Sequence, residues 1–137
     1  MNNDQPYLLD TCIISDLVRN PQGIVFDWIK EVGEELINTS IVVVSELRFG
    51  VQKKGSQRLK IQLAEILDVI RILPLKSPVD HEYAELRTYL EKTGQPIGPN
   101  DMLIAAHARA LNFTLVSANM KEFSRIPKLR LENWLTS

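Results

Sequence analysis

The run Tyr7-Leu8-Leu9-Asp10-Thr11 joins a short apolar stretch to an acidic residue. Such a stretch is typical of a short buried strand. Apolar side chains then recur at helical spacing until Asn20-Pro21, at Ile13, Ile14, Leu17 and Val18. The pattern predicts a strand that leads directly into a helix, with Asp10 at the junction.

The alternation of strand and helix continues along the next part of the chain. Residues 24–32 predict a helix that ends at Gly33, and residues 36–40 predict a second strand. A one-sided apolar stripe over residues 59–70 predicts another helix, which leads into an extended run at residues 71–75.

Two helices with clear start signals follow. In Ser77-Pro78-Val79-Asp80 we expect Ser77 as the N-cap and Pro78 at the first helical position of a helix that Gly94 closes. Gly98-Pro99-Asn100-Asp101 opens a second helix, with Asn112 as its left-handed cap. Two more strands are predicted at residues 113–116 and, at an edge of the sheet, 129–131.

Local signals conflict between residues 41 and 50. Ile41-Val42-Val43-Val44 favours a strand, whereas Ser45-Glu46-Leu47-Arg48-Phe49 favours a helix. Propensity alone leaves both structures open.

Strands separated by helices predict parallel pairing and an α/β fold, a three-layer α/β/α sandwich. With 137 residues, the chain is expected to form one domain, residues 1–137. In such sheets, ligands bind at the carboxyl ends of the strands. Residues that directly follow strands are therefore the candidates for chemistry.

Composition excludes several classes of protein. The net charge is −1, from 16 Lys and Arg against 17 Asp and Glu, so nucleic acid would have to bind at a local patch. A single cysteine, Cys12, excludes an internal disulfide, and no secretory signal pattern is present, so we expect a cytoplasmic protein. The longest apolar run, at residues 41–44, is far too short to span a membrane.

Three acids lie where they can reach the same edge of the sheet: Asp10, Glu46 and Asp101. Each acid also has an ordinary structural explanation. Asp10 can cap a helix, Glu46 can be a solvated acid on a helix, and Asp101 can interact favourably with the positive end of a helix dipole. Together they would repel one another unless a hard cation such as Mg²⁺ or Mn²⁺ lay between them. A zinc site is disfavoured, because His81 and His107 are isolated on predicted helices.

The ordered motifs of the chain resemble those of PIN-domain ribonucleases of the VapC toxin type. The most specific is the Pro-x-Gly-Pro-x-Asp-x-x-Ile-Ala-Ala segment, which begins at Pro96. The other blocks are Leu8-Leu9-Asp10-Thr11, Ile14-Ser15-Asp16-Leu17, Ser45-Glu46-Leu47-Arg48-Phe49-Gly50, Leu115-Val116-Ser117-Ala118-Asn119-Met120-Lys121-Glu122-Phe123 and Leu131-Glu132-Asn133-Trp134.

The resemblance implies a mostly parallel five-stranded sheet and places Glu46 on a helix, which resolves the conflict at residues 41–50. It implies catalytic and metal-binding roles for Asp10, Glu46 and Asp101. We expect Asn119 to support the metal shell through its side-chain oxygen or a bound water. Thr11 and Ser117 are expected to support these residues. Two departures matter: Asn119 stands where many members have a fourth acid, which removes one formal charge, and Cys12 stands where many have Asn, so we expect a polar contact to be missing there.

The implied function is a Mg²⁺-dependent endoribonuclease toxin, with Mn²⁺ as a substitute ion. Its expected partners are structured RNA such as tRNA, a small antitoxin protein and a second copy in a homodimer. We expect Asp10 and Asp101 to bind the ion and Glu46 to complete its shell or orient the attacking water. Products with 5′-phosphate and 3′-hydroxyl ends would follow.

Two groups of basic residues are candidates for holding RNA phosphates beside the acids. They are Lys53, Lys54, Arg58 and Lys60, and Lys121, Arg125, Lys128 and Arg130. Apolar residues such as Val51 and the stripe at residues 59–70 serve either the core or a partner contact. Two other functions stay open: an Asp-dependent phosphotransferase, which usually has a second acid at the position of Cys12, and a non-catalytic binding module.

Overall fold

The computed structural model describes residues 5–136, so residues 1–4 and Ser137 of the expected domain lie outside the described part. Five strands form one sheet in the order β3-β2-β1-β4-β5, and all four pairings are parallel. The strands are β1 (Tyr7–Leu9), β2 (Ile37–Ser40), β3 (Arg71–Leu73), β4 (Thr114–Val116) and β5 (Leu131–Glu132). The prediction of a parallel five-stranded α/β fold is confirmed.

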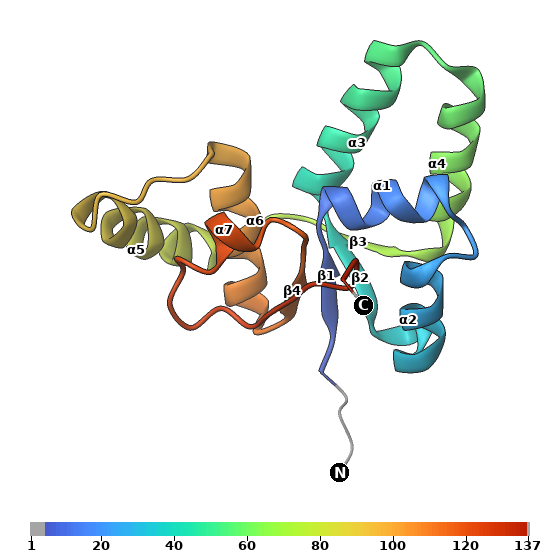
Figure 1. The fold of residues 1–137 in the computed structure, drawn as a ribbon. Helices are drawn as coiled ribbons and strands as arrows, with labels where there is room; N and C mark the ends of the chain where they lie inside the picture. Colours follow the sequence, from blue (N-terminus) through green and yellow to red (C-terminus); the bar gives the residue numbers. More distant parts are fainter. Residues whose placement is uncertain (1–4, 137) are drawn as a thin grey trace.

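Helices cover both faces of the sheet (Figure 1). One layer contains α1 (Thr11–Arg19), α2 (Ile24–Val32), α3 (Ile41–Lys54) and α4 (Gln57–Val69). The other contains α5 (Val79–Lys92), α6 (Pro99–Leu111) and α7 (Met120–Phe123). The central strand β1 is fully buried between these layers, and the strand order reverses between β1 and β4.

The disputed segment at residues 41–50 is helical. The Ser40 hydroxyl caps α3 by accepting from the Val42 backbone N–H at 3.1 Å. Val42, Val43 and Val44 are all buried in the core. Their burial and the serine cap outweigh the preference of valine for strands, as the resemblance implied.

The expected start of α5 is wrong by one position. The helix begins at Val79 with Pro78 as the N-cap residue, so Ser77 does not cap it. A turn precedes the helix, closed by the Val79 N–H and the Lys76 carbonyl at 3.0 Å. The predicted ends of α6 are confirmed, with Pro99 at its first position and Asn112 left-handed at its end.

Two side chains of α6 fix this helix to its neighbours. The buried His107 has Nδ1 2.9 Å from the Ser40 hydroxyl, and the Pro74 carbonyl lies near its ring. Burial lowers the pKa of His107, which keeps the imidazole neutral. His107 therefore connects α6 to the start of α3, whereas His81 is exposed.

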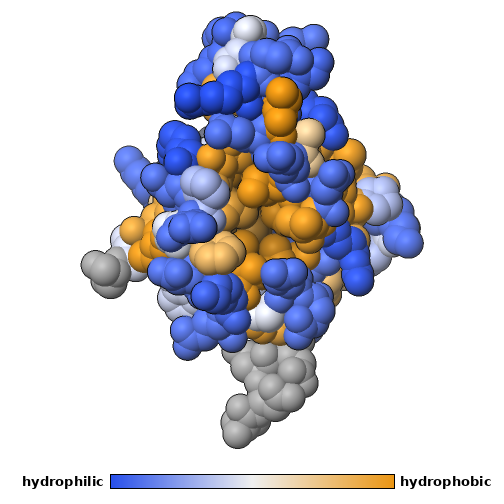
Figure 2. Space-filling model, turned by 90° about the vertical axis from the view of Figure 1, so that its right-hand side faces the viewer, coloured by the Kyte–Doolittle hydropathy of each residue, from blue (hydrophilic) through white to orange (hydrophobic). Residues whose placement is uncertain are grey.

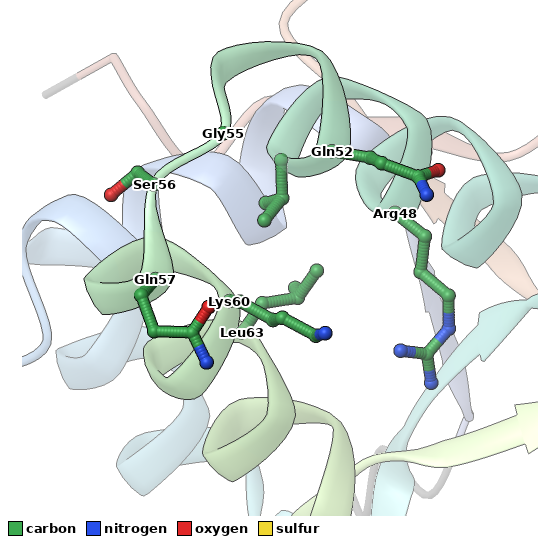
Figure 3. Close-up of a pocket in the computed structure, with 8 residues that line it drawn as sticks. Arg48, Gln52, Gly55, Ser56, Gln57, Lys60 and Leu63 are labelled. Carbon is green, nitrogen blue, oxygen red and sulfur yellow. The ribbon is translucent and has the colours of Figure 1, made fainter.

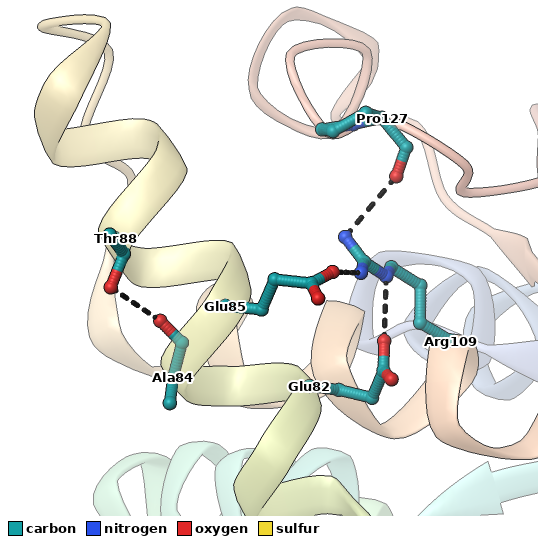
Figure 4. A network of polar contacts seen from close by, with 6 residues as sticks. All are labelled: Glu82, Ala84, Glu85, Thr88, Arg109 and Pro127. Carbon is teal, nitrogen blue, oxygen red and sulfur yellow. Dashed lines mark hydrogen bonds and ion pairs between the residues drawn. The ribbon is translucent and has the colours of Figure 1, made fainter.

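Arg109 makes the second connection, to α5 and the segment after α7 (Figure 4). Its guanidinium lies 2.9 Å from Glu82 and 2.6 Å from Glu85, and it also donates to the Pro127 carbonyl. Because the Arg109 side chain is only 7% exposed, this network is partly desolvated and holds the second helical layer together.

Among the described residues, none of the helices has both the length and the apolar character that crossing a bilayer requires.

Candidate functional site

The carboxyl edge of the sheet, at the reversal between β1 and β4, holds the first predicted acid. Asp10 follows β1, and its carboxylate accepts from the Thr11 backbone N–H at 2.8 Å and from the Ser117 hydroxyl at 2.7 Å. Ser117 directly follows β4. Asp10 therefore caps α1 and also lies at the reversal of strand order between β1 and β4. Its role as a helix cap is compatible with its proposed role in a metal site.

Asp10 is only 5% exposed. Burial raises the pKa of Asp10, and the bonds from Ser117 and Thr11 oppose part of this rise by stabilising the carboxylate. The charge of Glu46 raises the pKa further, so the two carboxylates lie within electrostatic range of each other.

Glu46, on α3, is held by donors from two other helices. Its Oε1 accepts from the Thr11 hydroxyl of α1 at 2.5 Å, and its Oε2 accepts from the Asn100 side chain of α6 at 3.1 Å. Thr11 thus supports both Asp10, through its backbone, and Glu46, through its side chain. The sequence predicted no role for Asn100, because its hydrogen bond with Glu46 depends on the tertiary fold.

Asp101 lies in the first turn of α6 and completes the predicted set. Burial, a hydrogen bond with Glu122 and the charges of Asp10, Glu122 and Glu46 raise the pKa of Asp101 to about 7. The structure therefore brings the three predicted acids into electrostatic contact.

Glu122, on the short helix α7, is a fourth acid that the sequence reasoning missed. The Asn119 side-chain N–H₂ lies 3.2 Å from Asp101 Oδ2 and 3.3 Å from Glu122 Oε1, so Asn119 bridges the two carboxylates. The amide nitrogen, not the amide oxygen expected to face a metal, points at Asp101. No periodic pattern marks Glu122; its only signal was its place in the motif that follows β4.

Cys12 lies beside the same edge and makes weak polar contacts. Its sulfur accepts from the Ala118 N–H at 3.3 Å and lies 3.9 Å from both Asp10 Oδ2 and the Ser117 hydroxyl. Burial raises the pKa of the Cys12 thiol, so it stays protonated. The expected loss of a polar contact at this position is therefore only partial.

The donor chemistry at this edge fits a hard divalent cation. As the side chains are placed within residues 5–136, no three His, Cys, Asp or Glu groups are close enough to hold an ion together. The carboxylates are instead occupied by Ser117, Thr11, Asn100 and Asn119. Facing carboxylates with raised pKa values are nevertheless the environment that Mg²⁺ neutralises best.

A groove of about 470 Å³ lies between α1, α3 and α4, and Glu46 is the acid of the site that lines it. Thr11 and Glu46 line one part of it, and Arg19, Lys54 and Arg58 line another. Arg19 was not among the predicted cations. The first predicted basic group thus contributes two residues to a groove that is continuous with the acidic edge.

The second predicted basic group does not surround the acids as a unit. Arg130 donates to Gln5 and to the Asn112 carbonyl, which lie at the amino ends of β1 and β4, opposite the acidic edge. Arg125 donates to the Pro96 carbonyl at 3.1 Å. These contacts give both arginines structural roles.

Apolar residues of the α4 stripe divide between the core and this groove. Leu63 and Leu67 are buried, whereas Val51 and Leu59 are half-buried and line the groove. Figure 2 shows that the face on the side of α2 and α4 is hollowed and apolar at its centre, with hydrophilic residues around it. The stripe therefore contributes both to the core and to the surface of the groove.

Comparison with known proteins gives consistent results. Residues 7–129 match the PIN domain family. The chain is 40% identical to ribonuclease VapC2 of Rickettsia felis over 130 residues, which covers 93% of this chain and 97% of the relative. It is also 30% identical over 104 residues to the tRNA(fMet)-specific endonuclease VapC of Salmonella typhimurium, covering 72% and 79% of the two chains.

Solved structures agree with the sequence relatives. The VapBC2 complex of Rickettsia felis, bound to a DNA fragment from its promoter, contains a chain with a TM-score of 0.86 and 38% identity, covering 93% of this chain and 98% of the other. FitAcB of Neisseria gonorrhoeae has a TM-score of 0.82 at 30% identity, covering 96% and 99%.

Proposed function

The chain belongs to the PIN-domain family of VapC ribonuclease toxins, and from this membership we propose that it is a metal-dependent endoribonuclease that works at the acidic edge of its sheet. The observation that carries the proposal is the convergence of Asp10, Glu46, Asp101 and Glu122 on one side of the β1/β4 reversal. The charges of the neighbouring acids raise the pKa values of Asp10 and Asp101, and a bound dication would remove that repulsion.

Asp10 and Asp101 are the proposed metal ligands, with Glu46 and Glu122 beside them. Mg²⁺, or Mn²⁺ in its place, would supply neutralisation of the charge that builds on the phosphate and a more acidic attacking water. The hydrogen bonds from Ser117 and the Thr11 N–H favour the ionised form of Asp10 and fix the direction of its carboxylate.

The remaining polar residues orient the other acids. Thr11 and Asn100 hold the two oxygens of Glu46, which leaves this carboxylate directed to accept a proton from the attacking water or to complete the metal shell. Asn119 holds Asp101 and Glu122 together as a donor, and we propose this as its role in the site. Hydrolysis by water leaves a 5′-phosphate and a 3′-hydroxyl.

We propose structured RNA, and tRNA in particular, as the substrate. Relatives that carry the name tRNA(fMet)-specific endonuclease support this choice. The groove beside Glu46 supports it as well, because Arg19, Lys54 and Arg58 offer positive charge to the phosphates on either side of the scissile bond.

An antitoxin protein and a second copy of the chain are the proposed partners. VapBC2 of Rickettsia felis is a similar structure, and another, VapBC-5 of Mycobacterium tuberculosis, is described as a member of the VapBC family of toxin–antitoxin systems. The apolar hollow in Figure 2 is a surface that such a partner would cover.

Cleavage of RNA by the purified protein tests the function. We expect cleavage with Mg²⁺ or Mn²⁺, none with chelator, and none by the Asp10→Asn variant in any buffer. The exposed Asp68→Asn change on α4 is the matched control and should leave the rate unchanged. Cleavage that survives chelation, or 2′,3′-cyclic product ends, would contradict the mechanism; binding without cleavage would favour the non-catalytic module.

A further inference from the structure

The hairpin of α3 and α4 is strongly basic. Between Glu46 and Glu65 the sequence contains five basic residues and no acidic residue, although the whole protein has a net charge of −1. The five are Arg48, Lys53, Lys54, Arg58 and Lys60. All five are exposed, and within residues 5–136 none of them takes part in an ion pair. Figure 1 shows that this hairpin projects from the body of the protein.

One side of the hairpin contains a second pocket, of about 330 Å³ (Figure 3). It shares Val51, Ser56 and Leu63 with the groove beside Glu46, but Arg48, Gln52 and Lys60 line this pocket alone. Arg48 reaches it from α3 and Lys60 from α4, and Val51 and Leu63 contribute its apolar wall. Arg48 is two residues after Glu46, which turns it about 200° around the helix axis. The pocket therefore opens on another face of α3 than the one that presents Glu46.

The charges of this pocket select an anion. Arg48 and Lys60 are brought to one opening without an acidic residue in its lining. An anion bound between them would relieve their mutual repulsion. The side-chain amides of Gln52 and Gln57 add hydrogen-bond donors and acceptors at the rim, and a volume of this size is within the range of small-ligand sites.

Resting on the proposed function, we propose that this pocket is an RNA subsite away from the scissile bond, which takes one nucleotide of a structured RNA with its phosphate between Arg48 and Lys60. The apolar wall would contact the sugar and base. RNA is favoured over an acidic protein segment because the groove beside Glu46 also contains basic residues, Arg19, Lys54 and Arg58. These residues would bind phosphates of the same RNA near the acidic edge. A folded RNA can contact both faces of a projecting hairpin.

Binding of tRNA tests the subsite. The Arg48→Gln, Lys60→Gln double variant removes both charges and keeps most of the side-chain volume. The matched control is Lys30→Gln, Lys92→Gln, which removes two exposed charges from α2 and α5. The probe is unfractionated, end-labelled bacterial tRNA in chelator, followed by fluorescence anisotropy over a series of salt concentrations. We expect roughly tenfold weaker binding and a log–log salt slope smaller by about 1 per lost phosphate contact, with the control unchanged.

The outcomes separate this subsite from the catalytic proposal. Because the tRNA affinity is measured in chelator, the expected loss does not depend on cleavage at the acidic edge. Affinity and salt slope for tRNA equal to those of the control would overturn the subsite. Unchanged tRNA affinity with loss of self-association in sedimentation would also overturn it and make the pocket a protein contact. If the wild-type protein binds tRNA as described but cleaves no RNA, the subsite stands and the nuclease assignment fails.

Discussion

Replacing Asp101 by Asn should stabilise the metal-free protein while removing its activity. The folded protein raises the pKa of this carboxyl from 3.8 to about 7, chiefly through burial and then through Glu122 and the other acids. Between these two values the folded state retains a proton that the unfolded state has released. The free energy of unfolding therefore falls as the pH rises from about 4 to about 7, and the full penalty is present above pH 7.

The size of this penalty follows from the shift. A shift from 3.8 to about 7, at about 1.4 kcal/mol per unit, sets an upper bound of roughly 4 kcal/mol. Asp101 is only half-buried, so solvent screening reduces the expected gain to about 1–2 kcal/mol. For a chain of this length that corresponds to an increase in Tm of roughly 3–6 °C. Asn keeps an oxygen that can accept from Asn119.

Thermal unfolding in chelator at pH 5 and pH 8 measures the effect. The gain in Tm for Asp101→Asn should be larger at pH 8, and Mg²⁺ should raise the Tm of the wild-type protein but not that of the variant. Asp68→Asn, an exposed acid on α4, should change Tm little at either pH. A variant that is less stable than the wild type at pH 8, or equally shifted at both pH values, would refute the reasoning.

Three further substitutions test particular contacts. Ser117→Ala removes the hydroxyl that donates to Asp10, so the rate of RNA cleavage should fall about tenfold or more while circular dichroism shows an unchanged fold; an unchanged rate would contradict a role for this bond. Arg109→Met leaves Glu82 without its buried partner and should lower the free energy of unfolding in urea by about 2 kcal/mol, and a loss below about 0.5 kcal/mol would show the network to be energetically neutral. His107→Phe removes the ring's hydrogen bond with Ser40 at a buried position and should cost about 2 kcal/mol by the same measurement; equal stability would mean that packing alone fixes α6.

The sequence predicted most of the fold because most elements carry a local signal. Gly33 and Asn112 end their helices through backbone conformations with positive φ, which their residue types favour. The start of α5 was misplaced because Ser77 and Pro78 suit several adjacent cap positions equally well. Residues 41–50 were undecided from propensity, since burial of Val43 depends on strands and helices distant in the sequence.

The candidate site was predictable to the extent that its acids follow strands or begin helices. Asp10 and Asp101 have such positions, and the structure brings both to one edge. Glu122 and Asn100 gain their roles only from tertiary contacts with Asp101 and Glu46, so no local pattern marks them. Arg130 shows the opposite error. Its closeness in sequence to Lys121 and Arg125 suggested a common basic group, but the structure places Arg130 at the amino ends of the strands.

Titration of Mn²⁺ into the purified protein, followed by the loss of the electron paramagnetic resonance signal of free Mn²⁺, tests most directly whether these carboxylates share an ion. We expect saturable binding that Mg²⁺ displaces, and its loss in both Asp10→Asn and Asp101→Asn while Asp68→Asn binds normally. Binding of equal strength in all four proteins, or none in the wild type, would contradict a metal-dependent nuclease at this edge.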